Sequence, residues 1–326
     1  MKIKAIHLSI PKTFFISVLA CLMSFIIGIY IGKTRGIPFV EKKTIWSIGI
    51  YTGPSPFDLT PPNNFENPVL TARDVKDVPA EFVADPFMVK ENNTWYMFFE
   101  VLNKKTNQGD LGVALSKDGL NWTYKQIILD EPFHLSYPYV FKWGNDYYMI
   151  PESNQAFSIK LYKAINSPYK WTFVKNLIEG KNFSDNSIIF HNNKWWIFTS
   201  IKNDTLRLYY SSDLLGPWTE HPKSPIINGN PSIARAGGRV ILFNNQIIRF
   251  AQDDYPYYGK QVRAFKITEL STQSYKEEEI GLILKPLGSG WNAKGMHHID
   301  PHQLDNGKWI ACVDGFKDSV VFGLKY

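Results

Sequence analysis

Acidic side chains recur at matching places in segments about fifty residues apart, and they are the residues best suited to chemistry. Asp85 and Asp185 each open one such segment, and Glu152 ends the corresponding stretch of the segment between them. Carboxyl groups that are crowded together shift one another's pKa values, as general acid and base chemistry requires. We therefore predict Asp85, Asp185 and Glu152 as catalytic candidates. The alternative is structural, because an Asp at the start of a strand can also cap a turn.

Histidine, arginine and aromatic side chains accompany these carboxyl groups. A strand through the run HHIDPH would place His298, Asp300 and His302 on one face, at a period of two residues. Buried histidines with hydrogen-bond partners are one interpretation of this run, and a metal ion or a cluster of water molecules is the other. We predict no metal and no cofactor. The predicted substrate-binding residues are His134, Tyr137, Tyr139, Arg235, Arg249, Asp253, Trp291, His298 and Asp300.

The elements that must position these residues come from an internal repeat. Three segments begin at Asp85, Tyr137 and Asp185, so their starts are 52 and 48 residues apart, and each has a turn followed by an aromatic pair. A turn between two strand-like runs is typical of a β-hairpin. Each unit continues into a second pair of strands that contains a tryptophan, so a unit comprises four strands. Glu100 and Asp314 end hairpins of this kind, and we predict them as ties between units.

The repeat predicts an all-β fold, a five-bladed β-propeller. A weaker fourth copy begins at Pro231 and a fifth at His298, and the fifth is expected to supply three strands. Residues 46–51, WSIGIY, have the composition of a strand and are expected to complete the fifth blade and close the ring. Five tryptophans of the repeat are expected to be core between the blades: Trp95, Trp122, Trp171, Trp195 and Trp218.

An uncharged apolar run of eighteen residues lies near the N-terminus, from Phe14 to Ile31, with Lys12 before it and Lys33 after it. It is long enough to span a bilayer as a helix and longer than the apolar region of a typical signal peptide. We predict a single-pass anchor with the propeller on the non-cytosolic side of the membrane, and a cleaved signal peptide is the alternative. The predicted boundaries are a tail at 1–13, a transmembrane anchor at 14–32, a linker at 33–45 and the propeller at 46–326.

The net charge of +6 belongs to the N-terminal end of the chain. Residues 1–45 contain seven Lys and Arg and one Glu, which leaves 29 residues of each sign in residues 46–326. A domain with balanced charge has no electrostatic footprint for nucleic acid, so we exclude nucleic acid as a partner. The only cysteines, Cys21 and Cys312, are too few for a disulfide framework or a thiolate metal site. The 44% of hydrophobic residues indicates a chain that folds around a core.

Five motifs together carry a resemblance to a known family. They are FVADPF (82–87), EPFHLSYPYVF (131–141), YMIPES (148–153), RFAQD (249–253) and GMHHID (295–300). From about Trp46 to its end, the chain resembles the N-terminal domain of plant glucosamine inositolphosphorylceramide transferase and its stand-alone microbial relatives. More distantly, it is similar to the five-bladed superfamily that includes glycoside hydrolase family 43. In the plant enzyme the resemblance implies that sugar transfer belongs to a separate C-terminal glycosyltransferase domain. This chain lacks that domain, so a separate glycosyltransferase is an expected partner.

The wider superfamily implies three acidic roles, and this chain matches two of them. Asp85 matches the general base of the first blade, and Asp185 opens the third blade, where the general acid is expected. The acid of the second blade is replaced by Tyr139, although Glu152 could supply a carboxylate from the same hairpin.

Two hypotheses about function follow from these matches. The first is a membrane-anchored module that binds carbohydrate or glycolipid in a central, carboxylate-rich pocket. The second is a glycosidase in which Asp85 activates water and Asp185 protonates the leaving oxygen. A scaffold without a ligand is a third reading, because a fold does not imply a function.

Overall fold

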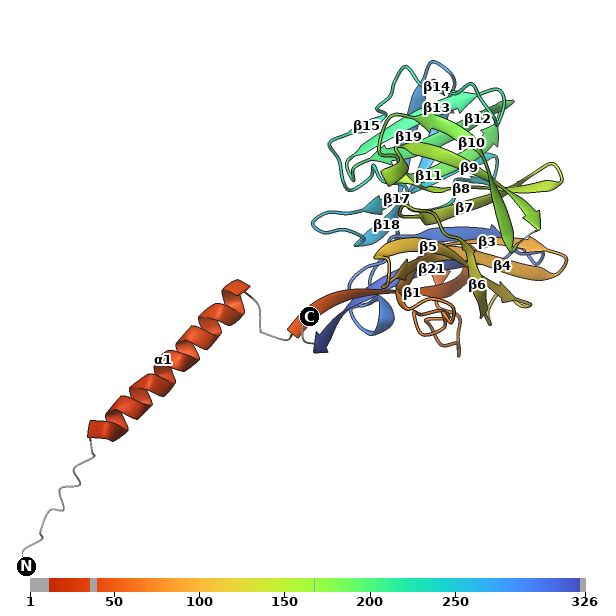
Figure 1. Ribbon diagram of the computed structural model, residues 1–326. Helices are drawn as coiled ribbons and strands as arrows, with labels where there is room; N and C mark the ends of the chain where they lie inside the picture. The colour runs from red at the N-terminus through yellow and green to blue at the C-terminus, as the bar shows by residue number, and fades with distance from the viewer. Residues whose placement is uncertain (1–11, 36–39, 167, 323–326) are drawn as a thin grey trace, which may run out of the picture. The chain divides into compact units, whose positions relative to one another are not determined.

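The structure is a computed structural model that describes residues 12–35, 40–166 and 168–322 (Figure 1). The chain forms two compact units, one of residues 1–44 with 318–326 and one of residues 45–317. The larger unit contains every candidate site residue.

The N-terminal apolar run forms a helix, α1 (Lys12–Arg35), as expected from its composition. In the part of the chain that the structure describes, no helix combines the length and the apolar character needed to cross a membrane. The helix is confirmed, while its role as a transmembrane anchor over residues 14–32 stays a prediction.

Five sheets make up the larger unit, and Figure 1 shows them following one another around it. Four of them are built from consecutive strands, as a propeller requires. The first two comprise β3 (Ala80–Glu91), β4 (Thr94–Asn103), β5 (Gln108–Ser116) and β6 (Thr123–Leu129), then β7 (Ser136–Trp143), β8 (Asp146–Glu152), β9 (Ser158–Asn166) and β10 (Lys170–Glu179). The next two comprise β11 (Ser184–His191), β12 (Lys194–Ile201), β13 (Thr205–Ser211) and β14 (Thr219–Glu220), with β15 (Ile227–Asn228) also paired to β13, then β16 (Ile241–Phe243), β17 (Gln246–Asp253), β18 (Gln261–Leu270) and β19 (Tyr275–Leu284). The five-bladed, all-β propeller is thereby confirmed.

The fifth sheet joins the two ends of the propeller, in the order β2-β1-β21-β20. Its strands are β1 (Val40–Ser55), β2 (Asp58–Thr60), β20 (Ile299–Gln303) and β21 (Trp309–Phe322). Closure by the N-terminal strand is confirmed, but the expected division of three strands and one is wrong. Residues 309–322 run as one long strand without a turn, so the fifth copy supplies two strands and the N-terminal segment supplies the other two.

Asparagine pairs form the turns of three inner hairpins. Asn92-Asn93, Asn192-Asn193 and Asn244-Asn245 all have positive φ, between 47° and 60°. Two consecutive residues with positive φ match the twist of a two-residue hairpin, and Asn tolerates this conformation better than most residues. These turns therefore hold the first and second strands of their blades in register. The first strands, in turn, start next to the candidate site.

The tryptophans of the repeat lie where the blades pack against one another. Trp95, Trp171 and Trp195 are buried, while Trp122 and Trp218 are partly buried against the same clusters. The predicted core role is therefore confirmed for three of them and partly for two. Two short 3₁₀ helices, η1 (Asn154–Ala156) and η2 (Gly290–Asn292), complete the described elements.

Candidate functional site

Three equivalent residues break the regular pairing at the start of the inner strands. Asp85, Tyr137 and Asp185 have φ of 53°, 47° and 49°, in the left-handed region. At each one the register between the first and second strands of the blade shifts. A bulge of this kind re-aims a side chain, and it is common near functional sites. The sequence repeat predicts that these three positions are equivalent, and their shared backbone conformation agrees with that prediction.

Two carboxylates at hairpin ends tie neighbouring blades together. Glu152 Oε2 accepts the backbone N–H of Asp185 at 3.0 Å, and Asp314 Oδ2 accepts the backbone N–H of Asp85 at 3.0 Å. Each bond crosses from one blade to the next, so Asp314 is the tie that the repeat predicts. Glu152, a predicted catalytic residue, serves in the same way.

The tie between Glu152 and Asp185 belongs to a larger set of contacts, the Arg235 network, which comprises Arg235, Asp185, Glu152, Gln252 and Asn203. Arg235 Nε donates to Asp185 Oδ2 at 2.5 Å, and its Nη1 and Nη2 donate to Asn203 Oδ1 and Glu152 Oε2 at 2.7 and 3.5 Å. Gln252 Nε2 donates to the same Asp185 oxygen at 2.6 Å. Burial and the Asp185 carboxylate raise the pKa of Glu152 to about 8. An oxygen that already accepts two hydrogen bonds is poorly placed to donate a proton, so this geometry does not favour Asp185 as the general acid.

A second set of contacts, the Asp85 cluster, comprises Asp85, Asp314, His297 and His298. Asp85 is 5% exposed, and its Oδ1 has no hydrogen-bond partner among the described residues. His297 Nε2 and His298 Nδ1 each lie 3.7 Å from this oxygen, while His297 Nδ1 lies 2.8 Å from Asp314 Oδ1. A buried acceptor without a partner is costly, so such an oxygen calls for a ligand.

The protonation of the Asp85 cluster follows from burial and from the charges within it. Burial raises the pKa of Asp85 well above its ordinary value, and nearby His297 opposes only part of the rise. Burial alone would lower the pKa of His297, but the surrounding carboxylates, Asp314 first, raise it to about 9. A carboxyl group with a raised pKa retains its proton, which suits an acid or a hydrogen-bond donor better than the predicted general base.

The histidines differ in how their ring nitrogens are used. Burial lowers the pKa of His298 to about 4, so its ring is neutral, and both ring nitrogens lack a partner in the described residues. The interpretation of buried histidines with hydrogen-bond partners, made for His298 and His302, therefore fits His302, whose Nε2 lies 2.9 Å from Asp300 Oδ2, and not His298. Donor atoms of Asp85, His297 and Asp314 lie within 4.8 Å of one another, a spacing that a metal ion could use. Two of the three already form a hydrogen bond with each other, so these two are satisfied without an ion.

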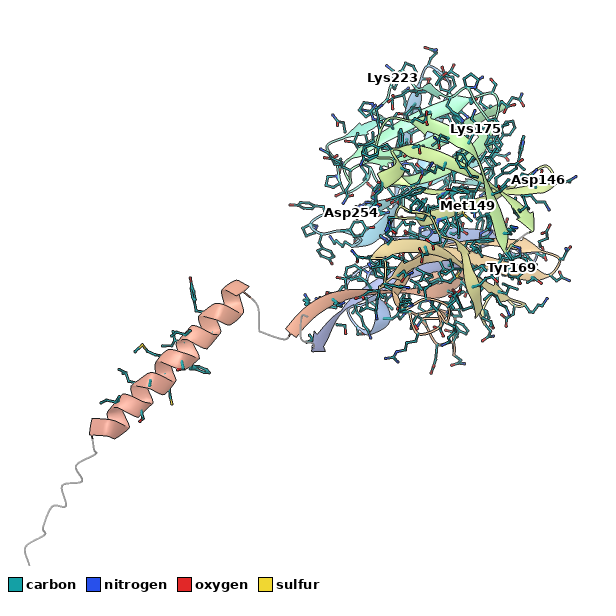
Figure 2. The ribbon with its side chains drawn as sticks, viewed as in Figure 1. Asp146, Met149, Tyr169, Lys175, Lys223 and Asp254 are labelled. Atoms are coloured by element: carbon teal, nitrogen blue, oxygen red, sulfur yellow. The ribbon has the colours of Figure 1, made fainter. Side chains whose placement is uncertain are left out.

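A loop after β17 adds Asp254, a carboxylate that the sequence does not predict as a site residue, and the aromatic ring of Tyr258, whose type and position suit stacking on a sugar. Asp254, labelled in Figure 2, is buried, and its Oδ1 accepts the backbone N–H of Gly259 at 2.8 Å. The Arg235 guanidinium lies 5.1 Å from the ring centre of Tyr258, which is partly exposed. The ring of Tyr258 also meets the His297 ring edge-on at 5.3 Å. The sequence contains two pairs of identical neighbours here, at 253–254 (Asp-Asp) and 297–298 (His-His). Such pairs indicate candidate site residues, but the sequence does not show which member of a pair belongs to the site.

Two predicted tyrosines are fully used inside the propeller. The hydroxyl of Tyr137 donates to the carbonyl of Gly238 at 2.8 Å and accepts the N–H of Gly238 at 2.7 Å. The hydroxyl of Tyr139 donates to the carbonyl of Ile188 at 2.7 Å. Both side chains are buried, so they connect blades and offer no surface to a ligand.

Other predicted binding residues also have internal partners. Arg249 forms a bidentate pair with Glu277 at 2.9 and 2.6 Å, and Asp253 accepts from Gln261 at 2.7 Å and Arg263 at 2.9 Å. His134 accepts the N–H of Gly109 at 2.9 Å and lies 3.3 Å from Glu100, and Trp291 packs over Gly49. Each of these four side chains therefore holds parts of the propeller together.

Asp300 lies in a third set of contacts. Its carboxylate pairs with Arg239 Nε at 2.5 Å and with His302 Nε2 at 2.9 Å, so the predicted shared face of Asp300 and His302 is confirmed. It also accepts the backbone N–H of Met88 at 2.5 Å. Arg239 further donates to the carbonyl of Val140 at 3.0 Å. The Arg239 contacts therefore join four blades, and Asp300 is a structural anion.

Comparison with known proteins identifies relatives in sequence and in fold. A family model described as glucosamine inositolphosphorylceramide transferase 1, N-terminal, matches residues 40–316. The chain is 40% identical over 296 residues to glucosamine inositolphosphorylceramide transferase 1 of Oryza sativa subsp. japonica, and the match covers 83% of the chain. The chain spans about 40% of the length of this curated relative.

Solved structures share the fold at low sequence identity. A putative glycoside hydrolase from Parabacteroides distasonis has a TM-score of 0.61 at 14% identity, covering 81% of this chain and 97% of its own. The catalytic domain of a family 62 α-L-arabinofuranosidase from Coprinopsis cinerea has a TM-score of 0.55 at 13% identity, covering 85% and 98%. These likenesses establish the fold alone, and they confirm the expected relation to five-bladed glycosidases at that level.

Proposed function

Since the chain belongs to the family of the N-terminal domain of glucosamine inositolphosphorylceramide transferase 1, we propose that its propeller binds a carbohydrate, or the sugar part of a glycolipid. The binding site in this proposal is the Asp85 cluster together with the adjoining Arg235 network and Tyr258. The domain would present its ligand to a glycosyltransferase, because the relatives are named as transferases.

One observation carries the proposal: Asp85 Oδ1 is a buried acceptor that no described group satisfies. Sugar hydroxyls are hydrogen-bond donors of the kind that such an oxygen lacks. The partly exposed ring of Tyr258 lies in the same neighbourhood, and aromatic faces beside a few polar groups are common in ligand sites. Family membership and the fold of the glycosidase-like structures point to the same class of ligand.

Asp85→Asn is expected to weaken glycan binding by up to about tenfold, since a hydrogen bond between neutral groups is worth about 0.5 to 1.5 kcal/mol. The full chain would be screened on a glycan array, and the affinity of the best glycan measured by isothermal titration calorimetry. Asp146→Asn is the matched control, because Asp146, labelled in Figure 2, begins β8 next to a hairpin turn and pairs with Lys163 at the surface. Equal affinities of the Asp85 variant and the control would refute the proposal.

Glycoside hydrolysis is the second candidate, and the raised pKa of Asp85 beside its unsatisfied oxygen favours it. A protonated Asp85 would then act as the acid, in place of the base role that the sequence implies. The test is release of chromophore from a panel of aryl furanosides and pyranosides by the full chain, with Asp85→Asn and Asp185→Asn beside it. Turnover that both variants lose would establish a glycosidase, and no turnover above the variants would favour the binding domain.

We also propose that the N-terminal segment anchors the protein in a membrane, with the propeller on the non-cytosolic side. The support is the uncharged run from Phe14 to Ile31. The full chain should stay in the membrane fraction after alkaline carbonate extraction, and the propeller should be digested by protease only where the non-cytosolic face is accessible. Release by carbonate would contradict the anchor.

A further inference from the structure

We infer that the proposed site takes in one free hydroxyl of its sugar ligand between Asp85 and His298, and that His298 is the residue that sets this specificity. The inference rests on the proposed function and narrows the ligand to sugars whose inserted hydroxyl is unsubstituted. It follows from two buried side chains whose polar atoms lie close together without a hydrogen bond between them.

The gap between these two side chains has the size of one bridging oxygen atom. Asp85 Oδ1 and His298 Nδ1 lie 3.7 Å apart, and neither has a hydrogen-bond partner in residues 12–35, 40–166 and 168–322. This separation is too long for a direct hydrogen bond and suits an oxygen that bonds to both atoms. His297 Nε2 also lies 3.7 Å from Asp85 Oδ1. An oxygen bound to Asp85 therefore has ring nitrogens close by.

The ring nitrogens of His298 serve no contact within the fold. The side chain is fully buried, and both nitrogens lack a hydrogen-bond partner in the part of the chain that the structure describes. Its ring packs edge-on against Phe87 at 4.6 Å and Tyr137 at 5.2 Å, contacts that a phenylalanine ring would make as well. Unpaired buried polar atoms lower the stability of a fold, and such exceptions are expected at functional sites. We therefore assign these nitrogens to the ligand.

A hydroxyl group suits this place in either protonation state of Asp85. A hydroxyl donates one hydrogen bond and accepts two, so it can donate to an ionised Asp85 or accept from a protonated one. Burial lowers the pKa of His298 to about 4, so its ring is neutral near pH 7 and offers one N–H donor and one nitrogen acceptor. A deoxy carbon can take neither role.

Burial also limits the size of the group that enters. Asp85, His297 and His298 are 5%, 2% and 0% exposed, so only a small part of a ligand can reach them. Tyr258 is 42% exposed, and its ring meets the His297 ring edge-on at 5.3 Å. We expect the sugar ring to lie against Tyr258 with one hydroxyl inserted toward His298. A methyl group or a further sugar on that oxygen would remove the donor and add bulk.

Modified sugars test the inference on the unaltered protein. The probes are the methyl pyranosides of glucose, mannose and galactose, each with its deoxy and O-methyl derivatives at every hydroxyl in turn. Dissociation constants for the full chain would be measured by NMR titration. We expect one position at which both derivatives bind at least about tenfold more weakly than the parent, because a site built to pair a hydroxyl rejects analogues without it. A bound parent that tolerates both changes at every position would overturn the inference, and the bridging oxygen would be a water molecule.

The variant His298→Phe tests the assigned residue. Because no described group uses the ring nitrogens, the urea midpoint should be unchanged or higher, while the parent sugar should bind about three- to tenfold more weakly. The deoxy derivative at the selected position should bind the wild type and the variant within about twofold, because its missing hydroxyl was the partner of His298. His191→Phe makes the same change at the end of β11 and should alter neither measurement.

Contrary results for this variant are equally clear. Wild-type affinity for the parent sugar would overturn the role of His298. A lower urea midpoint would show that the ring nitrogens serve the fold, and it would overturn the assignment as well. If the variant fails to fold, that assignment falls, and the modified sugars on the wild-type chain still decide whether a hydroxyl is inserted.

The outcomes separate this inference from the proposed function. Binding of no glycan, on the array or in titration, would remove the proposed function and the inference with it. Binding that tolerates the loss of every single hydroxyl would remove the inference alone.

Discussion

Replacing Arg239 by methionine is expected to lower the free energy of unfolding by about 3 to 5 kcal/mol, because it strands a buried anion. The Asp300 carboxylate is 0% exposed, and Arg239 Nε lies 2.5 Å from it. Arg239 also donates to the carbonyls of Val140 at 3.0 Å and Met88 at 3.2 Å. One side chain therefore satisfies three groups on three other blades. The measurement is urea unfolding of the full chain followed by tryptophan fluorescence.

The control for this prediction is a pair of the same charges at the surface. Lys163 and Asp146 lie 2.8 Å apart with side chains 36% and 44% exposed. Exposed pairs contribute little, so Lys163→Met should change the unfolding free energy far less than Arg239→Met does. The double variant Arg239→Met with Asp300→Asn should recover part of the loss, because it removes the unpaired charge. An Arg239 variant no less stable than the Lys163 variant would show that the buried pair is not a major contact.

Raising the pH from about 6.5 to 9 is expected to destabilise the fold by about 3 kcal/mol through His297, at about 1.4 kcal/mol per pKa unit. The pKa of His297 is raised from 6.5 to about 9 in the folded protein. The protonated ring, bound to Asp314, is thus favoured by folding. This contribution is fully present below pH 6.5 and is lost as the pH rises through 9. Urea unfolding at several pH values across this window measures it.

Two variants separate His297 from Glu152. The pKa of Glu152 is about 8 in the folded protein, against an ordinary value of 4.5. Folding therefore favours the protonated form of Glu152, and this stabilisation is lost as the pH rises from 4.5 to about 8. His297→Gln should flatten the slope between pH 8 and 9, where Glu152 contributes little. Glu152→Gln should flatten the slope mainly below pH 8. The assignment to His297 fails if His297→Gln retains the wild-type slope above pH 8.

Local patterns were sufficient for the blades because the turns and strands depend on neighbours in sequence. The asparagine pairs with positive φ mark three hairpins, and the aromatic pairs that follow mark the second strands. The same reasoning failed at the fifth blade. No local sequence pattern predicts that residues 309–322 form one continuous strand. Their pairing with β1 depends on a strand from the other end of the chain.

The candidate site could be predicted as a set of positions but not as a set of roles. Asp85, Tyr137 and Asp185 share one backbone conformation, as the repeat predicts, yet their side chains differ in use: Asp85 Oδ1 has no hydrogen-bond partner among the described residues, whereas Asp185 Oδ2 accepts from Arg235 and Gln252. Arg235 and Asp185 are hydrogen-bonded although they are 50 residues apart in the sequence, and Tyr137 and Gly238 are hydrogen-bonded although they are 101 residues apart. These partners come from other blades, so no pattern within one repeat reveals them.

By itself, the sequence determined the class of fold, the number of blades, the strand that closes the ring and the acidic residues at the blade starts. Those features follow from periodicity, turn residues and composition, which act over a few residues at a time. Only the tertiary structure decided that Asp254 keeps an oxygen without a hydrogen-bond partner in the described residues, while Asp253 is paired with Gln261 and Arg263. The physical reason is that whether a buried oxygen has a partner depends on contacts between blades, and Asp85 meets Asp314 across 229 residues of sequence.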